Sequence, residues 1–162
     1  MLALRICSVV ALLGMLVSEA GAAERKRVVL IGHAPDHPYR THCYLPDCEL
    51  LAKCLRQNGD IEAIVSRGWP TDPAVLEGVD AIVLHVRQGG DVLFHPTCRE
   101  QAAELLQQGV GLTAIHWSTG GTPGEIGDRY QAALGGLFHP DFSQYPVEKS
   151  IMRRATPDHP VS

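Results

Sequence analysis

The chain has 162 residues, of which 45% are hydrophobic and 20% charged, and its 14 Lys and Arg against 18 Asp and Glu give a formal net charge of −4. The negative net charge argues against a nucleic-acid-binding protein, which would carry an excess of basic residues. The high hydrophobic content argues against a disordered chain. The length favours a single domain.

The N-terminal residues have the pattern of an export signal. Arg5 precedes an uncharged apolar run over Ile6–Val17, and small residues at 20–22 resemble a cleavage site. The run is shorter than the roughly 20 apolar residues that cross a membrane. We therefore expect a signal peptide over residues 1–22, export to the periplasm or the extracellular space, and no stable membrane anchor after cleavage. A short buried N-terminal helix is the alternative.

Four short apolar runs predict the strands of a sheet in the mature chain. They are Arg27–Ile31, Ile61–Val65, Ala81–Val86 and Val110–Ile115. Continuous apolar runs of this length are typical of strands that are buried on both faces, as in parallel sheets.

Two helical patterns lie between these runs, and each ends at a glycine, which commonly follows the last turn of a helix. Pro46–Asn58 precedes Gly59, and Pro96–Gln108 precedes Gly109. The residues expected to face the core are Leu50, Leu51, Cys54 and Leu55 in the first helix and Ala102, Leu105 and Leu106 in the second.

A third helix is expected after Thr122, because Thr122 and Glu125 have the spacing of a capping box with Pro123 at the first helical position. Its inward residues would be Ile126, Tyr130, Ala133 and Leu134. Strands that alternate with helices through short connections predict an α/β fold with a doubly wound, mostly parallel sheet.

Six of the eight histidines follow predicted strands or lie in the loops after them. They are His33, His37, His42, His85, His116 and His139. Because ligands bind beyond the carboxyl ends of the strands in such sheets, we expect these side chains to form one pocket. Imidazole serves in acid–base catalysis near neutral pH and binds transition metals. A hydrogen-bonded structural role is the alternative for each histidine taken alone.

Other polar residues near the strand ends could complete this pocket. Gly89 and Gly90 could offer backbone N–H groups to an anionic oxygen, or could form a plain turn. Asp36, Asp141 and Asp158 could orient imidazoles, although a solvated surface position is the simpler interpretation of each. No H-E-x-x-H or C-x-x-C spacing specifies a metal.

The four cysteines that remain after cleavage of the signal have the character of structural residues. None of them follows a strand in the setting of a nucleophile elbow, which argues against a thiol enzyme. A disulfide between Cys43 and Cys98 is left open, since export permits disulfides. The other two are Cys48 and Cys54.

Seven segments carry a resemblance to a known family. They are VVLIGHAPDHPYRTH (Val28–His42), ELLAKCL (Glu49–Leu55), GWP (Gly68–Pro70), VDAIVLHVRQGG (Val79–Gly90), GVGLTAIHWST (Gly109–Thr119), GEIGDRYQAALGGLF (Gly124–Phe138) and DHPV (Asp158–Val161). In their order and spacing the chain resembles the ThuA-like (trehalose utilisation) family, whose fold is similar to that of class I glutamine amidotransferases.

The resemblance implies a flavodoxin-like sheet and a role in the use of trehalose or keto-sugars. It also implies that His116 occupies the turn where amidotransferases carry a cysteine nucleophile, so that glutamine hydrolysis is not expected. His37 and His42 match pocket residues of the family. Because the family continues past the D-H-P-[IV] segment, residues 23–162 are expected to be a ThuA-like domain that lacks its C-terminal part.

Two functions follow from these expectations. The first is an exported enzyme that acts on a small sugar substrate, by isomerising or epimerising a keto-sugar or, as a second choice, by metal-assisted hydrolysis. His116, His37 and His42 would be catalytic or would hold a divalent transition metal. The substrate would contact His33, His85, Gly89, Gly90, Trp117 and His139.

The alternative is a non-catalytic carbohydrate-binding or accessory domain. It would use aromatic side chains to stack on sugar rings, and the candidates are Trp69, Trp117 and Tyr39. Packing in the core is the competing interpretation of these residues. Neither function involves a nucleic-acid partner.

Overall fold

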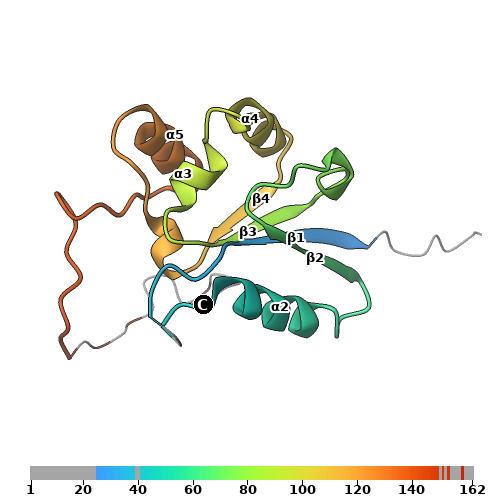
Figure 1. Ribbon diagram of the computed structural model, residues 1–162, viewed down its shortest axis with the longest axis horizontal. Helices are drawn as coiled ribbons and strands as arrows, with labels where there is room; N and C mark the ends of the chain where they lie inside the picture. The colour runs from blue at the N-terminus through green and yellow to red at the C-terminus, as the bar shows by residue number, and fades with distance from the viewer. Residues whose placement is uncertain (1–24, 39–40, 150, 152, 154–157, 159–162) are drawn as a thin grey trace, which may run out of the picture. The chain divides into compact units, whose positions relative to one another are not determined.

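The computed structural model describes residues 25–38, 41–149, 151, 153 and 158, and Figure 1 shows its helices and strands. The expected signal peptide, Tyr39 and His159 lie outside these residues. The elements are, in chain order, β1 (Lys26–Gly32), α2 (Tyr44–Leu55), β2 (Ile61–Arg67), the 3-10 helix η1 (Pro73–Val75), β3 (Ala81–His85), α3 (Gly89–Leu93), α4 (Arg99–Gln107), β4 (Gly111–Ala114), the 3-10 helix η2 (His116–Thr119) and α5 (Glu125–Leu134).

The four strands form one parallel sheet in the order β2-β1-β3-β4. The pairing of β1 with β2 runs from Lys26 opposite Ile61 to Gly32 opposite Arg67. All four strands predicted from apolar runs are present, and the α/β, doubly wound class is confirmed. None of the helices within the described ranges is long and apolar enough to cross a membrane.

The packing of the chain divides it into two compact units at Val83 and Leu84, within β3. In the first unit, α2 packs on β1 and β2 around a cluster of Leu30, Cys48, Ala52 and Ala63. The end of β1 approaches the first turn of α2 closely, because a Cβ added at Gly32 would lie 3.1 Å from Cys48 Sγ.

The buried face of α2 differs from the predicted one. Tyr44, Cys48 and Ala52 are buried, whereas Leu50 is 61% exposed and Cys54 is also exposed. The helix begins two residues before Pro46. Residues four apart lie on one face of a helix, so the face that starts at Tyr44 places the small side chains of Cys48 and Ala52 against the sheet. Of the expected stripe, Leu55 packs half-buried against the cluster around Leu30, but Leu50, Leu51 and Cys54 are exposed, so the prediction is wrong for these three.

The two cysteines of α2 are expected to differ sharply in reactivity. Burial raises the pKa of the Cys48 thiol to about 11, so this residue carries almost no thiolate near neutral pH. Treatment of the folded protein with a disulfide reagent at pH 8 should modify Cys54 rapidly and Cys48 only after unfolding. Mass spectrometry of the labelled peptides measures this, and Cys54→Ser is the control. Rapid labelling of Cys48 would contradict its burial.

An ion pair joins the start of β1 to the residue before β3. Asp80 accepts hydrogen bonds of 2.7 Å from Lys26 Nζ and from the backbone N–H of Arg27, and these hold its pKa below the ordinary value. Because the folded pKa is depressed, the stabilisation is present above the unfolded Asp pKa of about 3.9 and is lost as pH falls through the folded value.

Urea unfolding of Asp80→Asn should therefore show a loss of stability relative to the wild type at pH 7 and a much smaller loss near pH 2. The matched control is Asp60→Asn, which changes an exposed aspartate in the same unit. A loss that is equally large at both pH values would show that the carboxylate charge of Asp80 is not its source.

In the second unit, two helix starts differ from the prediction. The α4 helix begins at Arg99 because the residues after His95 form a turn, in which the Cys98 and Arg99 N–H groups both donate to His95 O at 2.9 Å. The α5 helix begins after Gly124, whose φ is 95°, and no side chain caps it, so the capping box is wrong. Tyr130 is buried as predicted, but Ala133 is exposed.

A buried polar network joins three parts of the second unit. Ser118 Oγ accepts from the Val86 N–H at 2.7 Å and lies 2.8 Å from Val86 O, to which it donates. Tyr130 donates its hydroxyl hydrogen to Ser118 O at 2.5 Å. The end of β3, the η2 turn and α5 are thus fixed together, and η2 carries two of the predicted site residues, His116 and Trp117.

Candidate functional site

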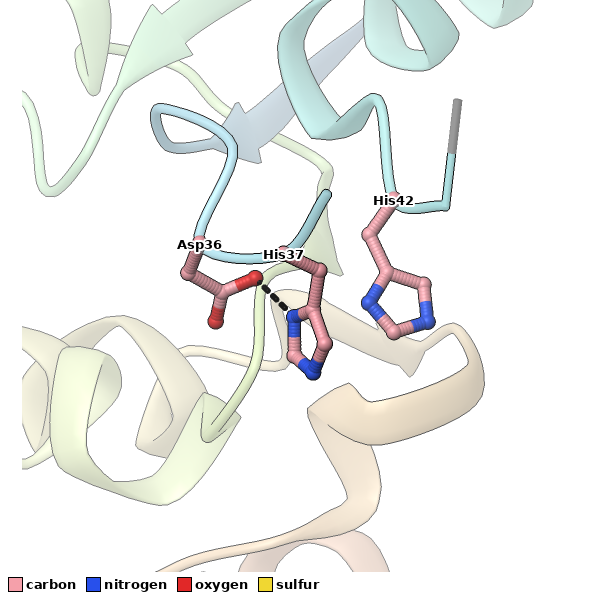
Figure 2. A group of neighbouring side chains, drawn as sticks. All are labelled: Asp36, His37 and His42. Carbon is pink, nitrogen blue, oxygen red and sulfur yellow. Dashed lines mark hydrogen bonds and ion pairs between the residues drawn. The ribbon is translucent and has the colours of Figure 1, made fainter. Parts of the chain in front are cut away.

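The loop between β1 and α2, in the first unit, brings together Asp36, His37 and His42 (Figure 2). Asp36 Oδ1 lies 2.5 Å from His37 Nδ1, and these two side chains are 23% and 33% exposed. The His42 ring stands nearly perpendicular to that of His37, with 4.3 Å between centroids. The contact brings two of the predicted site histidines side by side, and their catalytic or metal-binding role stays a prediction.

The three side chains are placed as ligands of one metal ion would be. One ligand atom from each lies within 4.8 Å of the others. Ligand atoms at about 2.0–2.2 Å from a tetrahedral metal are about 3.4 Å from one another. Small rotations of the side chains would therefore bring the three atoms to coordinating distance. Two imidazoles and one carboxylate form a donor set that suits zinc, iron or manganese and leaves coordination positions open for a substrate.

The Tyr44 ring packs against this group, although no motif in the sequence points to it. Its ring is fully buried and lies 4.2 Å from the His33 ring and 5.5 Å from the His42 ring, measured between centroids. Burial opposes ionisation of Asp36, but hydrogen bonds from His37 and Tyr44 and the nearby charges of His37 and His33 outweigh it and lower the pKa of the carboxyl. The carboxylate is therefore ionised at neutral pH.

His33 is the fourth polar residue at this end of β1. Its Nδ1 lies 2.5 Å from the backbone oxygen of Ala34, and its ring packs on Tyr44. This hydrogen bond fixes Nδ1 as the donor in the neutral ring. The contacts give His33 a supporting position beside the three candidate ligands.

In the second unit, His116 directly follows the β4 region and begins η2. Its φ is 57°, and among the described residues it is the one non-glycine with a positive φ. A left-handed conformation is costly for such a residue and is often found at functional sites. The side chain is exposed, and Thr119 Oγ1 donates to His116 O at 3.0 Å. The expected position of His116 in a tight turn after a strand agrees with this geometry.

Two open cavities lie beside Trp117 in the same unit. The first has a volume of about 220 Å³ and is lined by His116, Trp117, Thr119, Phe138 and Tyr145. The second, of about 170 Å³, is lined by Arg87, Gln88, Trp117, Gly120, Phe138, His139 and Pro140. Of the predicted substrate-binding residues, Trp117 and His139 thus line a cavity.

The other residues predicted to contact the substrate in this unit are surrounded by groups of the protein itself. His85 is only 8% exposed and lines neither cavity. The Gly90 N–H donates to Gly120 O at 3.0 Å, and Gly89 lies against Ser118 and Tyr130. The Gly90 N–H is therefore already used within the protein. Roles of His85, Gly89 and Gly90 in substrate binding stay predictions.

The predicted pocket of six histidines is divided between the two units. His33, His37 and His42 belong to the first, and His85, His116 and His139 to the second, so their convergence stays a prediction. The cysteines Cys43, Cys48, Cys54 and Cys98 are all free, and the disulfide left open from the sequence is absent between these residues.

The chain matches no protein-family profile, no curated protein and no solved structure. The resemblance to ThuA-like proteins therefore depends on the sequence segments alone.

Proposed function

We propose that the protein binds a divalent transition metal ion through Asp36, His37 and His42 and acts on the carbonyl group of a sugar. The observation that carries the proposal is the mutual proximity of the three donor atoms, all within 4.8 Å. The resemblance to ThuA-like proteins supports a sugar as the substrate, with a keto-sugar preferred, and the N-terminal pattern supports export.

The residues of the loop would prepare the metal site as follows. Asp36 accepts from His37 Nδ1, and this hydrogen bond holds the two side chains together. A metal ion held by Asp36 and His37 would replace that hydrogen after small rotations of the two side chains. The ionised Asp36 adds a negative charge that favours a cation. A bound metal would polarise the carbonyl oxygen of the substrate and make the neighbouring C–H more acidic.

The preferred reaction is proton transfer next to that carbonyl. In epimerisation the proton would leave one carbon and return to the opposite face of the same carbon. In isomerisation it would return to the former carbonyl carbon, while the hydroxyl hydrogen of the neighbouring carbon moves to the former carbonyl oxygen. Neither requires an oxidant. A neutral imidazole is suited to move this proton near pH 7.

The experiment uses untagged protein and has two readouts. Elemental analysis after dialysis should find close to one zinc, manganese or iron per chain. NMR in D₂O should then show deuterium entering a keto-sugar next to its carbonyl, with exchange lost in EDTA and restored by the metal. Absence of both bound metal and exchange would refute the proposal.

A non-catalytic carbohydrate-binding function is the second candidate, and the aromatic cavity of Trp117, Phe138 and Tyr145 favours it. Exposed aromatic faces can stack on the C–H face of a sugar ring. Calorimetry would separate the two functions. This candidate predicts that a sugar binds with measurable heat to metal-free protein and that no deuterium enters the sugar.

A further inference from the structure

The two cavities beside Trp117 share a wall, because both are lined by Trp117 and Phe138. Their volumes are about 220 and 170 Å³, each below the range of about 300–1,000 Å³ found for drug-sized sites, so they suit a small ligand. A monosaccharide placed at the shared Trp117 and Phe138 rings would contact both cavities.

The first cavity presents an aromatic surface. The Trp117 and Phe138 rings meet edge to face, with centroids 5.3 Å apart, and Tyr145 lies 6.0 Å from Trp117 and 5.8 Å from Phe138. Tyr145 is 71% exposed, so part of this surface is open to a ligand. Such a surface suits the apolar C–H face of a ring that carries polar groups at its edge.

The second cavity adds hydrogen-bond donors and a cation. Arg87 and Gln88 line it together with His139. The Asp141 N–H donates to His139 Nδ1 at 3.3 Å, so the neutral ring carries its hydrogen on Nε2 and can donate from there. Asp141 Oδ2 also lies 3.5 Å from Nδ1, but that carboxylate is 82% exposed. The guanidinium of Arg87 has the planar donor geometry that pairs with a carboxylate.

The walls are held by backbone hydrogen bonds. Phe138 N donates to Thr119 O at 2.9 Å, and Gly120 forms a parallel bridge with Phe138. Beyond them, Ser143 N donates to His139 O at 2.8 Å, and His139 N donates to Ser143 Oγ at 3.1 Å. Preformed walls reduce the entropy that binding would cost.

We propose that the second unit binds an anionic sugar, a hexuronate-type monosaccharide. Its ring lies against Trp117 and Tyr145, and its carboxylate is held by Arg87. The inference rests on the proposed function only in taking a carbohydrate as the ligand, since its contacts are independent of the metal ligands.

The test is calorimetry in EDTA with glucuronate, its methyl ester, glucose and AMP as separate probes. Glucuronate should bind with a Kd below about 1 mM and at least tenfold more tightly than glucose or the ester. Arg87→Gln should weaken glucuronate binding about tenfold and leave glucose unchanged. Arg67→Gln removes the same charge from an exposed arginine of β2 and should behave as the wild type. Tyr145→Ala should weaken the binding of both glucuronate and glucose.

Three affinity results, beyond a complete absence of binding, would overturn the proposal. They are equal affinity for glucuronate and glucose, glucuronate binding that Arg87→Gln does not change, and tighter binding of AMP than of glucuronate. Absence of heat from every probe would also overturn it. Circular dichroism checks the fold of each variant. Because EDTA is present, glucuronate binding by protein that fails the metal and exchange assays would refute the proposed function and leave this inference standing.

Discussion

Metal binding is expected to disappear when His37 and His42 are both replaced by alanine. The change removes two of the three candidate ligands and leaves Asp36 as the only one. We expect bound metal to fall from about one to less than 0.1 per chain and the affinity for Zn²⁺ to fall at least about a hundredfold. Competition with a chromophoric chelator measures the affinity, and elemental analysis measures the stoichiometry.

Two controls make this result specific. His95→Ala removes an exposed histidine of the second unit and should leave zinc affinity unchanged. Asp36→Asn keeps the shape of the side chain and removes its charge, and it should lower the affinity about 10–100-fold. If the double variant retains stoichiometric zinc with wild-type affinity, the metal ligands lie elsewhere and the proposed site is wrong.

Substitution of Gly89 by alanine is expected to destabilise the second unit strongly. A Cβ at this position would overlap Ser118 O and the Tyr130 hydroxyl, which are joined by a hydrogen bond. Neither atom can withdraw without breaking the network around Ser118. We expect a loss of about 3 kcal/mol in the free energy of unfolding and a fall of roughly 10 °C in melting temperature.

Gly136→Ala is the matched control, because a Cβ there would meet nothing within 4 Å. It should change the melting temperature by no more than about 2 °C. Calorimetric melting of both variants provides the comparison. Equal melting temperatures for Gly89→Ala and the wild type would mean that β3, η2 and α5 are not packed as described.

The sequence predicted the strands better than the helix faces. Each strand is a continuous apolar run, and this signal is local. The face of α2 was predicted wrongly because Leu50 and Leu51 are more apolar than Cys48 and Ala52, whereas close packing against β1 requires small side chains. The start of α5 was missed because the backbone of Gly124 sets it, without a side-chain cap.

The candidate metal site was partly predictable for the same reason. His37 and His42 lie in one loop, so their proximity follows from a few residues of chain. The role of Tyr44 was missed because a buried aromatic residue at the start of a helix gives no separate signal. Phe138 and Tyr145 were missed because both lie far from Trp117 in the sequence. No local pattern predicts the pairing of Gly120 with Phe138 or the ring contacts of these residues with Trp117.

The three candidate metal ligands all fall within residues 36–42. Closing so short a loop around an ion costs little chain entropy, and the cost grows only with the logarithm of loop length. Affinity should then depend mainly on how firmly Tyr44 holds Asp36 and His42 before the ion arrives. Lengthening the connection between α2 and β2 should therefore leave zinc affinity unchanged, whereas removal of the Tyr44 ring should weaken it.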